Sequence, residues 1–552
     1  MDAPDDFTDY YMEDIEGYYD SPDRIVIKAF NPYPNSPGGF REWWRKLYGT
    51  DNNLDRKQMM RMAGRFGETV RKYAFRNNIP YVKAENGERK DEISERHLPS
   101  DPEFAGVFLI VVGRAQAPVW EVKRDGDGKI LEIFRQKNWP YVNHIHFHIM
   151  DKEWGHVIVR MCTYPPFGAL IILNGHEWVE RTARRHCVPS TKRDNCFVGG
   201  DFQALNHVAK ALRGESAQRR LANACDRWVY SACLVFGLSL EDQEKTGFRY
   251  RYSCYQVEYS RNLAFRNGRL MDEVYQGMID RTRACLDIKI LRTVFGFKRG
   301  PQLNKKTGSQ KKDVESILER RSYDMTVFKV RWGGFTVKIY DKGERVLRFE
   351  VTVHNTKELR CGRMLECWPE LIGKMQGVMD RFMNTVRAAD HAFIGGEVFD
   401  SLPLPVLMKG SSVSGINMES QRMRAVIFSV MALATAPEGF TARELATKVQ
   451  HENGWNDKSY CVKRASYDLR KLRARKLVHT PKFRHRYLVE PSAFQTLWAY
   501  VTIRDKVIRP LLAGMENSKK LRSPKIKSPI DQHYVNFRHE MIRTFETLGI
   551  AV

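Results

Sequence analysis

The stretch His144-Ile-His-Phe-His-Ile149 alternates between histidine and an apolar residue, and it sets the pattern for the middle of the chain. Side chains of a β-strand point alternately to its two faces, so the three imidazoles should share one face at intervals of about 6.6 Å. Two further runs follow, His156-Val-Ile-Val-Arg-Met161 and Leu170-Ile-Ile-Leu173, and the second ends at Asn174-Gly175. Short strands joined by tight turns predict an antiparallel meander.

Strand-like and helical segments occur on both sides of this meander. Strand-like runs cover residues 107–112, 250–259, 326–331, 335–340 and 346–353. The pair Gly333-Gly334 favours a hairpin, because both glycines accept positive φ angles. Helical spacing marks residues 55–74, 202–238, 271–286 and 368–392. The chain is therefore predicted to be an α+β protein, with a mixed α/β segment at 24–140 and a β-rich central domain with helical insertions at 141–400.

Residues 418–513 are predicted to form a winged helix-turn-helix, after a Pro/Gly/Ser-rich linker at 401–417. Apolar residues recur at helical spacing over 420–434, and Thr441-Ala-Arg-Glu444 matches a capping box. A third helix begins at Ser459, and a strand, a basic loop and a strand follow it. The alternatives are an ordinary helical domain with a solvated basic face, and a winged helix that binds protein.

A recognition helix needs donors for phosphates and base edges, and the third helix with its following loop is rich in them. The candidate nucleic-acid-binding residues are Lys463, Arg464, Arg470, Lys471, Arg473, Arg475, Lys482, Arg484 and Arg486. A loop at 300–312, punctuated by glycine and proline, adds Lys305, Lys306, Lys311 and Lys312. These residues leave open whether the ligand is DNA or RNA.

The charge of the chain favours a polyanionic partner. The 552 residues carry a formal net charge of +24, and 42% of them are hydrophobic, as in a folded protein. Residues 1–23 hold nine acids and no Lys or Arg, so they are predicted to be a disordered acidic tail; folding back onto the basic surface is the alternative. Residues 514–552 are predicted to be a basic tail with a helix.

The same bulk features limit the class of protein. The ten cysteines form no C-x-x-C pair, which indicates neither a zinc ribbon nor a disulfide framework. No run of about 18 apolar residues occurs, so we expect a cytoplasmic protein without a membrane partner. The oligomeric state stays open.

Three short motifs could carry chemistry. The first is His144, His146 and His148, a spacing suited to a divalent metal ion but also to a histidine-rich strand that faces solvent. The second is Leu173-Asn-Gly-His-Glu-Trp178, a strand end whose turn should expose His176 and Glu177, unless it merely packs Trp178. The third is the pair Gln256-Val-Glu258 and Arg348-Phe-Glu350. Carboxylates inside strands need partners, and either a metal ion or Arg348 could serve.

These motifs resemble those of the phage and plasmid rolling-circle replication initiators. The matches run in the family's order over about residues 141–360: Asn174-Gly-His176, Gln256-Val-Glu258, Lys338-Ile-Tyr-Asp-Lys342 and Leu347-Arg-Phe-Glu350. The chain is more similar to a bacterial family of unassigned activity that combines Asn-Gly-His-Glu-Trp and Tyr-Asp-Lys with a C-terminal winged helix. The resemblance implies a replication-initiator-like central region.

The resemblance also implies a metal-dependent nicking reaction that leaves a 5′-phosphotyrosine. Mg²⁺ or Mn²⁺ would be held by His144, His146, Glu258 and Glu350. The catalytic residues would be His176, Glu258, Glu350 and a tyrosine nucleophile from Tyr255, Tyr259 and Tyr340. None of these tyrosines has the isolated helical setting of a relaxase nucleophile.

Two hypotheses follow. The first is a DNA-binding protein of mobile-element or replication-initiator type that nicks DNA. The second is a binding protein without catalysis, either a transcriptional regulator or the protein component of a ribonucleoprotein that binds structured RNA.

Overall fold

The structure, a computed structural model, describes residues 6–85, 88, 90–285, 314–322, 325–332, 335–390, 402–408, 410–418, 420–434, 439–481 and 485–490, with scattered positions from 497 onward. The candidates Lys305, Lys306, Lys311, Lys312, Lys482 and Arg484 and most of the predicted basic tail lie outside these residues. The chain divides into two compact units. The first holds residues 8–275 and 317–380, and the second holds residues 381–552 with 276–316.

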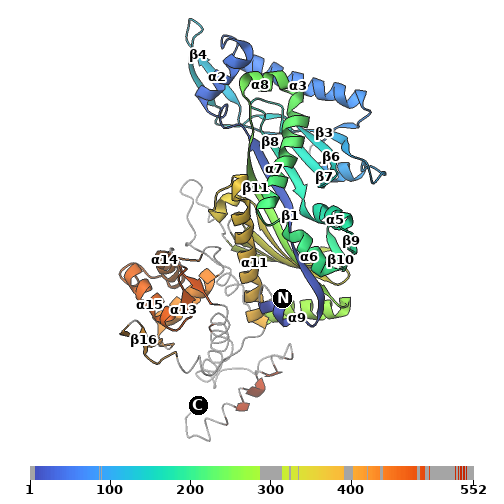
Figure 1. Cartoon of the computed structure of the whole chain (residues 1–552). Helices are drawn as coiled ribbons and strands as arrows, with labels where there is room; N and C mark the ends of the chain where they lie inside the picture. Colours follow the sequence, from blue (N-terminus) through green and yellow to red (C-terminus); the bar gives the residue numbers. More distant parts are fainter. Residues whose placement is uncertain are drawn as a thin grey trace. The chain divides into compact units, whose positions relative to one another are not determined.

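A sheet of eleven strands organises the first unit (Figure 1), in the order β12-β13-β14-β15-β11-β1-β8-β7-β6-β3-β2. The pairings described are antiparallel except the one between β2 and β3. The strands are β1 (Ile15–Phe30), β2 (Tyr81–Lys83), β3 (Gly106–Gln116), β6 (Tyr141–Asp151), β7 (Gly155–Cys162), β8 (Ala169–Asn174), β11 (Arg251–Phe265), β12 (Val314–Ser322), β13 (Met325–Trp332), β14 (Phe335–Asp341) and β15 (Val346–Val353).

Several sequence-based predictions are confirmed by this sheet. Strands β6, β7 and β8 form the predicted antiparallel meander. Strands β13 and β14 pair from Trp332 and Phe335 outward, as the predicted hairpin requires. The protein is a mixed α+β structure with one large mixed sheet.

Helices and small hairpins surround the sheet. The helices are α1 (Asp6–Tyr10), α2 (Pro37–Tyr48), α3 (Arg56–Arg76), α4 (Lys90–Glu95), α5 (Gly175–Arg185), α6 (Phe202–Lys210), α7 (Glu215–Cys225), η1 (Asp226–Cys233), η2 (Leu234–Phe236), α8 (Leu240–Thr246), α9 (Gly268–Cys285), η3 (Thr356–Leu359), η4 (Leu365–Cys367) and α11 (Trp368–Asp390). The two-stranded sheets are β4 (Trp120–Arg124) with β5 (Ile130–Arg135), and β9 (Ser190–Arg193) with β10 (Cys196–Gly200).

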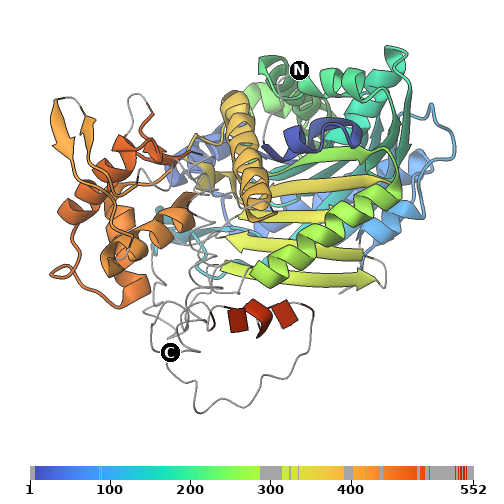
Figure 2. The same ribbon diagram turned by 90° about the horizontal axis from the view of Figure 1, so that it is seen from below.

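The two faces of the large sheet differ in chemistry. One face is apolar: Phe147, Val159, Ile171 and Ile27 are neighbours across four strands, and each is fully buried. Phe236 of η2 stacks on Phe147 with ring centroids 5.7 Å apart, and α11 lies across the strands in Figure 2. The core of the first unit therefore lies between the apolar face and these helices.

The opposite face carries polar side chains on β6 and again on β11 and β15, with apolar residues of β7, β8 and β1 between them. It holds the three histidines of β6, and the register leads from His148 through Ile158, Ile172 and Val26 to Gln256 of β11. Glu258 and Ser260 follow Gln256 on the same face of β11, because each lies two residues further along the strand. Ser260 pairs with Glu350 of β15, so Glu350 shares this face as well. The histidine motif and the two glutamate motifs thus share one face of one sheet.

The acidic N-terminal segment is folded: residues 6–10 form α1, in which Phe7 is fully buried, and residues from 15 onward belong to the sheet. The prediction of a disordered tail over residues 1–23 is therefore wrong from residue 6 onward. Strand β1 begins at Ile15 and pairs with both β8 and β11. Asp20 and Asp23 are buried because Arg261 and Arg348 neutralise them. The predicted boundary at residue 140 is wrong as well, since β1, β2 and β3 belong to the same sheet as β6.

The second unit contains the helices α13 (Gln421–Ala434), α14 (Ala442–Asn453) and α15 (Val462–Ala474) and the strands β18 (Val478–His479) and β19 (Leu488–Val489). Strands β18 and β19 pair antiparallel, and an isolated bridge joins Phe440 to Tyr487. The predicted capping box is present, because Thr441 and Glu444 each accept a hydrogen bond from the other's backbone amide.

The predicted linker at 401–417 contains a hairpin, β16 (Val406–Met408) and β17 (Ser411–Val413), turning at Gly410 with φ +75°. It contacts α15: the Arg470 guanidinium donates to the Ser411 hydroxyl, and Ser414 and Tyr467 hydroxyls lie 2.8 Å apart. Packing against α15 orders a segment whose composition is typical of a loop. No helix among the described residues is both long and apolar enough to cross a membrane.

We predict that Arg261→Ala destabilises the first unit strongly. Arg261 is 1% exposed and donates from Nε and Nη2 to the two carboxylate oxygens of Asp20, each at 2.8 Å. Removing it leaves a buried charge without its partner, which typically costs about 3–5 kcal/mol. Urea denaturation followed by circular dichroism measures the loss. Arg269→Ala, which breaks an exposed pair with Glu273, is the control and should cost about 1 kcal/mol or less; equal losses would contradict the prediction.

Candidate active site

A cavity of about 750 Å³ opens on the polar face of the sheet in the first unit. It brings together side chains from β1, β8, β11, β14 and β15, far apart in the sequence. The polar residues that line it are Asp23, Arg24, Glu95, His156, Asn174, Glu177, Arg181, Asp194, Asn195, Glu258, Tyr340, Lys342, Arg348 and Glu350. Three candidates from the sequence, Glu258, Glu350 and Tyr340, are therefore in one site.

Tyr340 and Glu350 form a hydrogen-bonded pair within this cavity. The Tyr340 hydroxyl donates to Glu350 Oε2 at 2.8 Å. The other carboxylate oxygen accepts from Lys338 Nζ at 2.5 Å and from the Thr352 hydroxyl at 2.9 Å. Burial and the negative charge of Glu350 raise the pKa of Tyr340 well above its usual value. The carboxylate is thus oriented as an acceptor for the phenol proton, the relation of a nucleophile to its base.

Glu258 reaches the same cavity from the neighbouring strand β11. Its Oε1 accepts a hydrogen bond of 3.3 Å from Gln256. Burial, and then the negative charges of Glu350 and Asp23, raise the pKa of Glu258 from 4.5 to about 7. A carboxyl group with this pKa can donate or accept a proton near neutral pH. Glu258 is the side chain of the site best suited to acid–base chemistry.

Arg348 and Asp23 form the buried base of the site. Arg348 is 2% exposed and donates from Nη1 to Asp23 Oδ2 at 3.2 Å and from Nε to Asn262 Oδ1 at 2.6 Å. The Asn195 amide also donates to Asp23. Burial acts to raise the pKa of Asp23, but His176, Arg348 and Asn195 outweigh it and hold this pKa far below its usual value. Asp23 therefore stays ionised as a structural counter-ion.

His176 is fully buried, so the prediction that its turn exposes it is wrong. The Asn174 side chain caps α5 by accepting the His176 backbone N–H at 2.9 Å, which turns the ring inward. The His176 Nδ1 atom lies 3.3 Å from Asp23 Oδ1, and the His176 ring packs against Tyr19 and Phe197. Burial lowers the pKa of His176. The ring positions Asp23 and does not line the cavity.

The other two candidate tyrosines lie outside the cavity. Tyr259 is fully buried on the opposite face of the sheet. Its hydroxyl donates to Asp20 at 3.2 Å and accepts from Gln376 of α11 at 2.9 Å. Tyr255 is 42% exposed, beside an irregularity in the β1–β11 pairing. Only Tyr340 of the three can meet a substrate in this cavity.

The three histidines share one face of β6, as predicted, but their neighbours are cationic. His146 pairs with Arg160 across β7, and Lys90 lies beside it. Burial followed by these cations lowers the pKa of His144 to about 4 and that of His146 to about 2. Burial and His156 lower the pKa of His148 to about 3. The row is neutral at physiological pH.

The predicted metal ligands His144, His146, Glu258 and Glu350 cannot hold one ion. Strands β7, β8 and β1 separate β6 from β11. At about 4.8 Å per strand, the distance across the sheet is roughly 19 Å, far beyond a ligand distance of about 2.0–2.6 Å. The set is wrong as a single site, because the order of the strands could not be read from the motifs.

The carboxylates of the cavity do not fit a divalent ion either. Of the three carboxylates nearest Tyr340, Asp23 and Glu350 already accept hydrogen bonds from Arg348, Asn195, Lys338, Tyr340 and Thr352, and Glu258 accepts one from Gln256 but none from a cation. Within the described parts of the chain, no three His, Cys, Asp or Glu side chains are grouped to hold a metal ion. The Lys338 and Arg348 cations take the place that a metal ion would occupy beside these acids.

The basic candidates of the second unit fall into two groups. Lys463, Arg464 and Arg470 of α15 are exposed. Arg464 and Arg470 nevertheless donate to the Ser459 carbonyl and the Ser411 hydroxyl. The others are more buried: Lys471 is 8% exposed with Nζ 4.9 Å from the centre of the Tyr467 ring, and Arg475 donates to the Leu404 carbonyl. Arg473 is half-buried, and Arg486 donates to the Gly439 carbonyl at 2.8 Å.

Sequence reasoning missed Asp23, Asn195, Asn262, Lys338 and Thr352. A signal existed for Thr352, since Arg348, Glu350 and Thr352 alternate on one strand face. Lys338 was likewise in phase with Tyr340. No such signal marked Asp23, which lies in the acidic segment. No family model, curated protein or solved structure matches the chain.

We predict that Glu258→Gln changes the pH dependence of stability. Because folding raises the pKa of Glu258 from 4.5 to about 7, the native state of the wild type loses stability as pH rises through this range. The variant lacks that loss, so its stability relative to the wild type should increase between pH 4 and pH 8 by on the order of 3 kcal/mol. Denaturation at both pH values measures it, and ¹³C NMR of the Glu258 carboxyl should titrate near pH 7. A titration near 4.5 would contradict the assignment.

Proposed function

We propose that this chain is a nucleic-acid-binding protein of replication-initiator type, which binds DNA through its second unit and transfers a strand to Tyr340 in its first. The observation that carries the catalytic half is the Tyr340–Glu350 hydrogen bond of 2.8 Å, beside Glu258 with a pKa of about 7. This is a nucleophile, a base oriented by two further donors, and a second acid–base group in one cavity.

The reaction that suits these groups is a transesterification of a phosphodiester. The Tyr340 oxygen attacks phosphorus while its proton passes to Glu350. The bond from phosphorus to the 3′-oxygen breaks, and the protonated form of Glu258 supplies the proton to that oxygen. The product is a 5′-phosphotyrosine and a free 3′-hydroxyl. The cations available to the phosphate are Arg24, Arg181 and Lys342, which line the cavity.

The cavity itself does not attract a polyanion by charge. Its lining includes six carboxylates, and only Arg24, Arg181, Lys342 and Arg348 among Lys and Arg. The chain as a whole carries +24, so its excess of positive charge lies elsewhere. Capture of the nucleic acid therefore falls to another surface, and the cavity acts on a strand delivered to it.

We infer that the second unit is a winged helix-turn-helix that performs this capture. The order of its elements supports the inference: α13, the Phe440 bridge, α14, α15, β18 and β19 follow the order helix, strand, two helices, strand and strand. The bridge from Phe440 to Tyr487 and the β18–β19 pair form the edge from which a wing would project. Helix α15 would enter the major groove of DNA with Lys463 and Arg464 in its first turn.

Binding without catalysis is the second candidate function, and one observation favours it. Both oxygens of Glu350 are already occupied by Tyr340, Lys338 and Thr352, so the polar face can be stable as a purely structural network. A regulator or a ribonucleoprotein component, as the sequence also allows, would have this property. The two functions differ in whether Tyr340 becomes covalently attached to DNA.

We predict that Tyr340→Phe abolishes a covalent adduct with single-stranded DNA. The wild type, incubated with an end-labelled oligonucleotide in EDTA, Mg²⁺ or Mn²⁺, should yield a labelled protein band on a denaturing gel. Loss of the hydroxyl removes the attacking oxygen and should reduce the adduct by at least about 1,000-fold. Tyr255→Phe is the matched control and should leave the adduct intact.

An adduct that persists in Tyr340→Phe would refute the role of this tyrosine. A wild type that forms none in any of the three conditions would leave binding without catalysis as the function.

We predict that Lys463→Ala/Arg464→Ala weakens binding to duplex DNA in a salt-dependent way. If both cations contact phosphates, the slope of log affinity against log salt should fall by about 2, at roughly 0.9 per contact. Fluorescence anisotropy over a range of KCl concentrations measures it. Lys123→Ala/Lys129→Ala, which removes the same charge from the exposed β4–β5 hairpin of the first unit, should leave the slope unchanged. If both double variants reduced the salt slope equally, the loss would reflect net charge and would contradict a specific contact by Lys463 and Arg464.

A further inference from the structure

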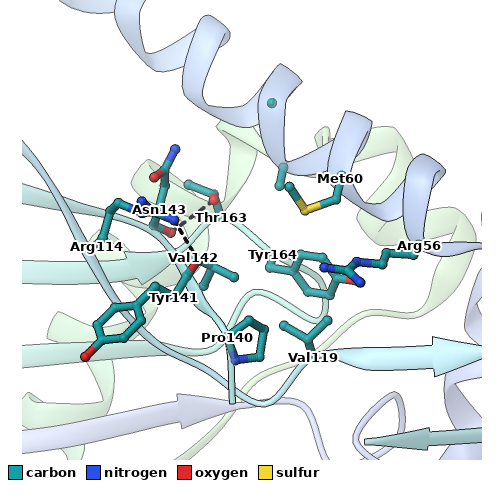
Figure 3. A pocket seen from close by; sticks show the side chains of 12 residues that line it. Arg56, Met60, Arg114, Val119, Pro140, Tyr141, Val142, Asn143, Thr163 and Tyr164 are labelled. Atoms are coloured by element: carbon teal, nitrogen blue, oxygen red, sulfur yellow. Dashed lines mark hydrogen bonds between the residues drawn. The ribbon is translucent and has the colours of Figure 1, made fainter. Parts of the chain in front are cut away.

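A second cavity of the first unit, of about 610 Å³, has a different lining and no assigned role (Figure 3). It lies between α3 and the segment where β6 begins. Its volume is within the range of about 300–1,000 Å³ that is usual for small-ligand sites. Neither Asp nor Glu lines it, in contrast to the acidic cavity beside Tyr340. The lining residues are Arg56, Met60, Ala63, Gly64, Arg114, Val119, Pro140, Tyr141, Val142, Asn143, Thr163 and Tyr164.

Two apolar walls face each other across this cavity. Met60, Ala63 and Gly64 are spaced three and four residues apart on α3 and so share one side of the helix. In Figure 3, Met60 lies on one side, and Val119 and Pro140 lie on the other. A Cβ atom placed on Gly64 would meet no atom within 4 Å, so the space beside it is open. An apolar space of this size accepts a flat ring.

The edge of the cavity offers a hydrogen-bonding side chain. The Thr163 hydroxyl and backbone N–H both donate to the Asn143 carbonyl, at 3.0 and 3.2 Å, which fixes the backbone there. The Asn143 carboxamide itself makes no hydrogen bond to the part of the chain that the structure describes, and Asn143 is exposed. A carboxamide presents one acceptor and two donor hydrogens, the pattern that pairs with the edge of a nucleobase.

Two arginines flank the cavity from opposite sides in Figure 3. Arg114 donates from Nη2 to the Tyr141 carbonyl at 3.3 Å, which leaves its other N–H groups toward solvent. Arg56 Nη1 lies 3.9 Å from Glu121 Oε1, and the Arg56 side chain is 64% exposed. Guanidinium groups in this state are suited to phosphate oxygens. Tyr141, 61% exposed at the mouth, adds an aromatic face for stacking.

We propose that this cavity binds one nucleotide unit, with the base between α3 and Pro140, its edge at Asn143 and its 5′-phosphate at Arg114. Arg56, on the opposite side, would meet the next phosphate when the nucleotide belongs to a strand. The source is either a free nucleotide or one nucleotide of a single strand. For the second source, the inference rests on the proposed function, because the strand would be the nucleic acid that the protein binds.

The test fills the cavity without disturbing the fold. Gly64 lies inside α3, outside the positive-φ region and beside open space, so Gly64→Leu should fold with equal or higher Tm, since leucine has the higher helix propensity. Gly67→Leu is the matched control: Gly67 is on the same helix, an added Cβ atom there would also meet no atom within 4 Å, and Gly67 does not line the cavity.

Isothermal titration of the full chain with each of the four ribonucleoside 5′-monophosphates, and with a 12-nucleotide mixed single strand, gives the affinities. Gly64→Leu should weaken the best nucleotide at least tenfold, and Gly67→Leu should change it less than twofold. Arg114→Ala should weaken the nucleotide but not the corresponding nucleoside. If Gly64→Leu lowers the affinity for the single strand alone, the natural ligand is a strand. If it lowers the affinity for the mononucleotide by the same factor, the natural ligand is a free nucleotide.

The proposal is overturned if Gly64→Leu folds and its affinities for both the mononucleotides and the single strand equal those of the wild type. That outcome is distinct from a failure of the proposed function, because duplex binding through Lys463 and Arg464 and the adduct at Tyr340 do not use this cavity.

Discussion

Two buried ion pairs hold the central strand of the large sheet in place. Asp20 and Asp23 of β1 meet Arg261 of β11 and Arg348 of β15, and all four side chains are nearly inaccessible to solvent. Charges in such a position are tolerated only when each finds its partner. Because β1 lies between β8 and β11, this pairing fixes the register that brings Glu258, Glu350 and Tyr340 to one cavity. The site therefore depends on acids that take no part in its proposed chemistry.

The sequence was sufficient for local structure. The β6–β8 meander, the antiparallel pairing of β13 with β14 and the capping box at Thr441 all follow from alternation, turn chemistry and capping rules, and all three are present. It failed where a distant partner decides the outcome. Nine Asp and Glu residues with no Lys or Arg among residues 1–23 predicted a solvated tail. Strand β1 is nevertheless buried, because arginines more than two hundred residues later neutralise its acids.

The candidate site was predictable in part for the same reason. Glu258, Glu350 and Tyr340 were chosen from motifs in a consistent order along the chain, and the structure places them together. The histidines of β6 were assigned to the same site, and they lie on the same face but several strands away. Alternation reveals which face a side chain occupies, but it contains no information on strand order. Burial of His176 was likewise hidden, since it depends on Tyr19 and Phe197 packing over the ring.

The position of β1 has a consequence for how the protein is made. Ile25 pairs with Leu173 and with Val257, so β1 is synthesised well before either of the strands that cover its two edges. At about 5–20 residues per second, the interval before β11 is synthesised is roughly 10 to 50 seconds. Until then the edge that β11 will cover stays open to other chains. The acids of its N-terminal half, which the finished fold neutralises, keep this waiting segment charged and hinder it from pairing with a second copy.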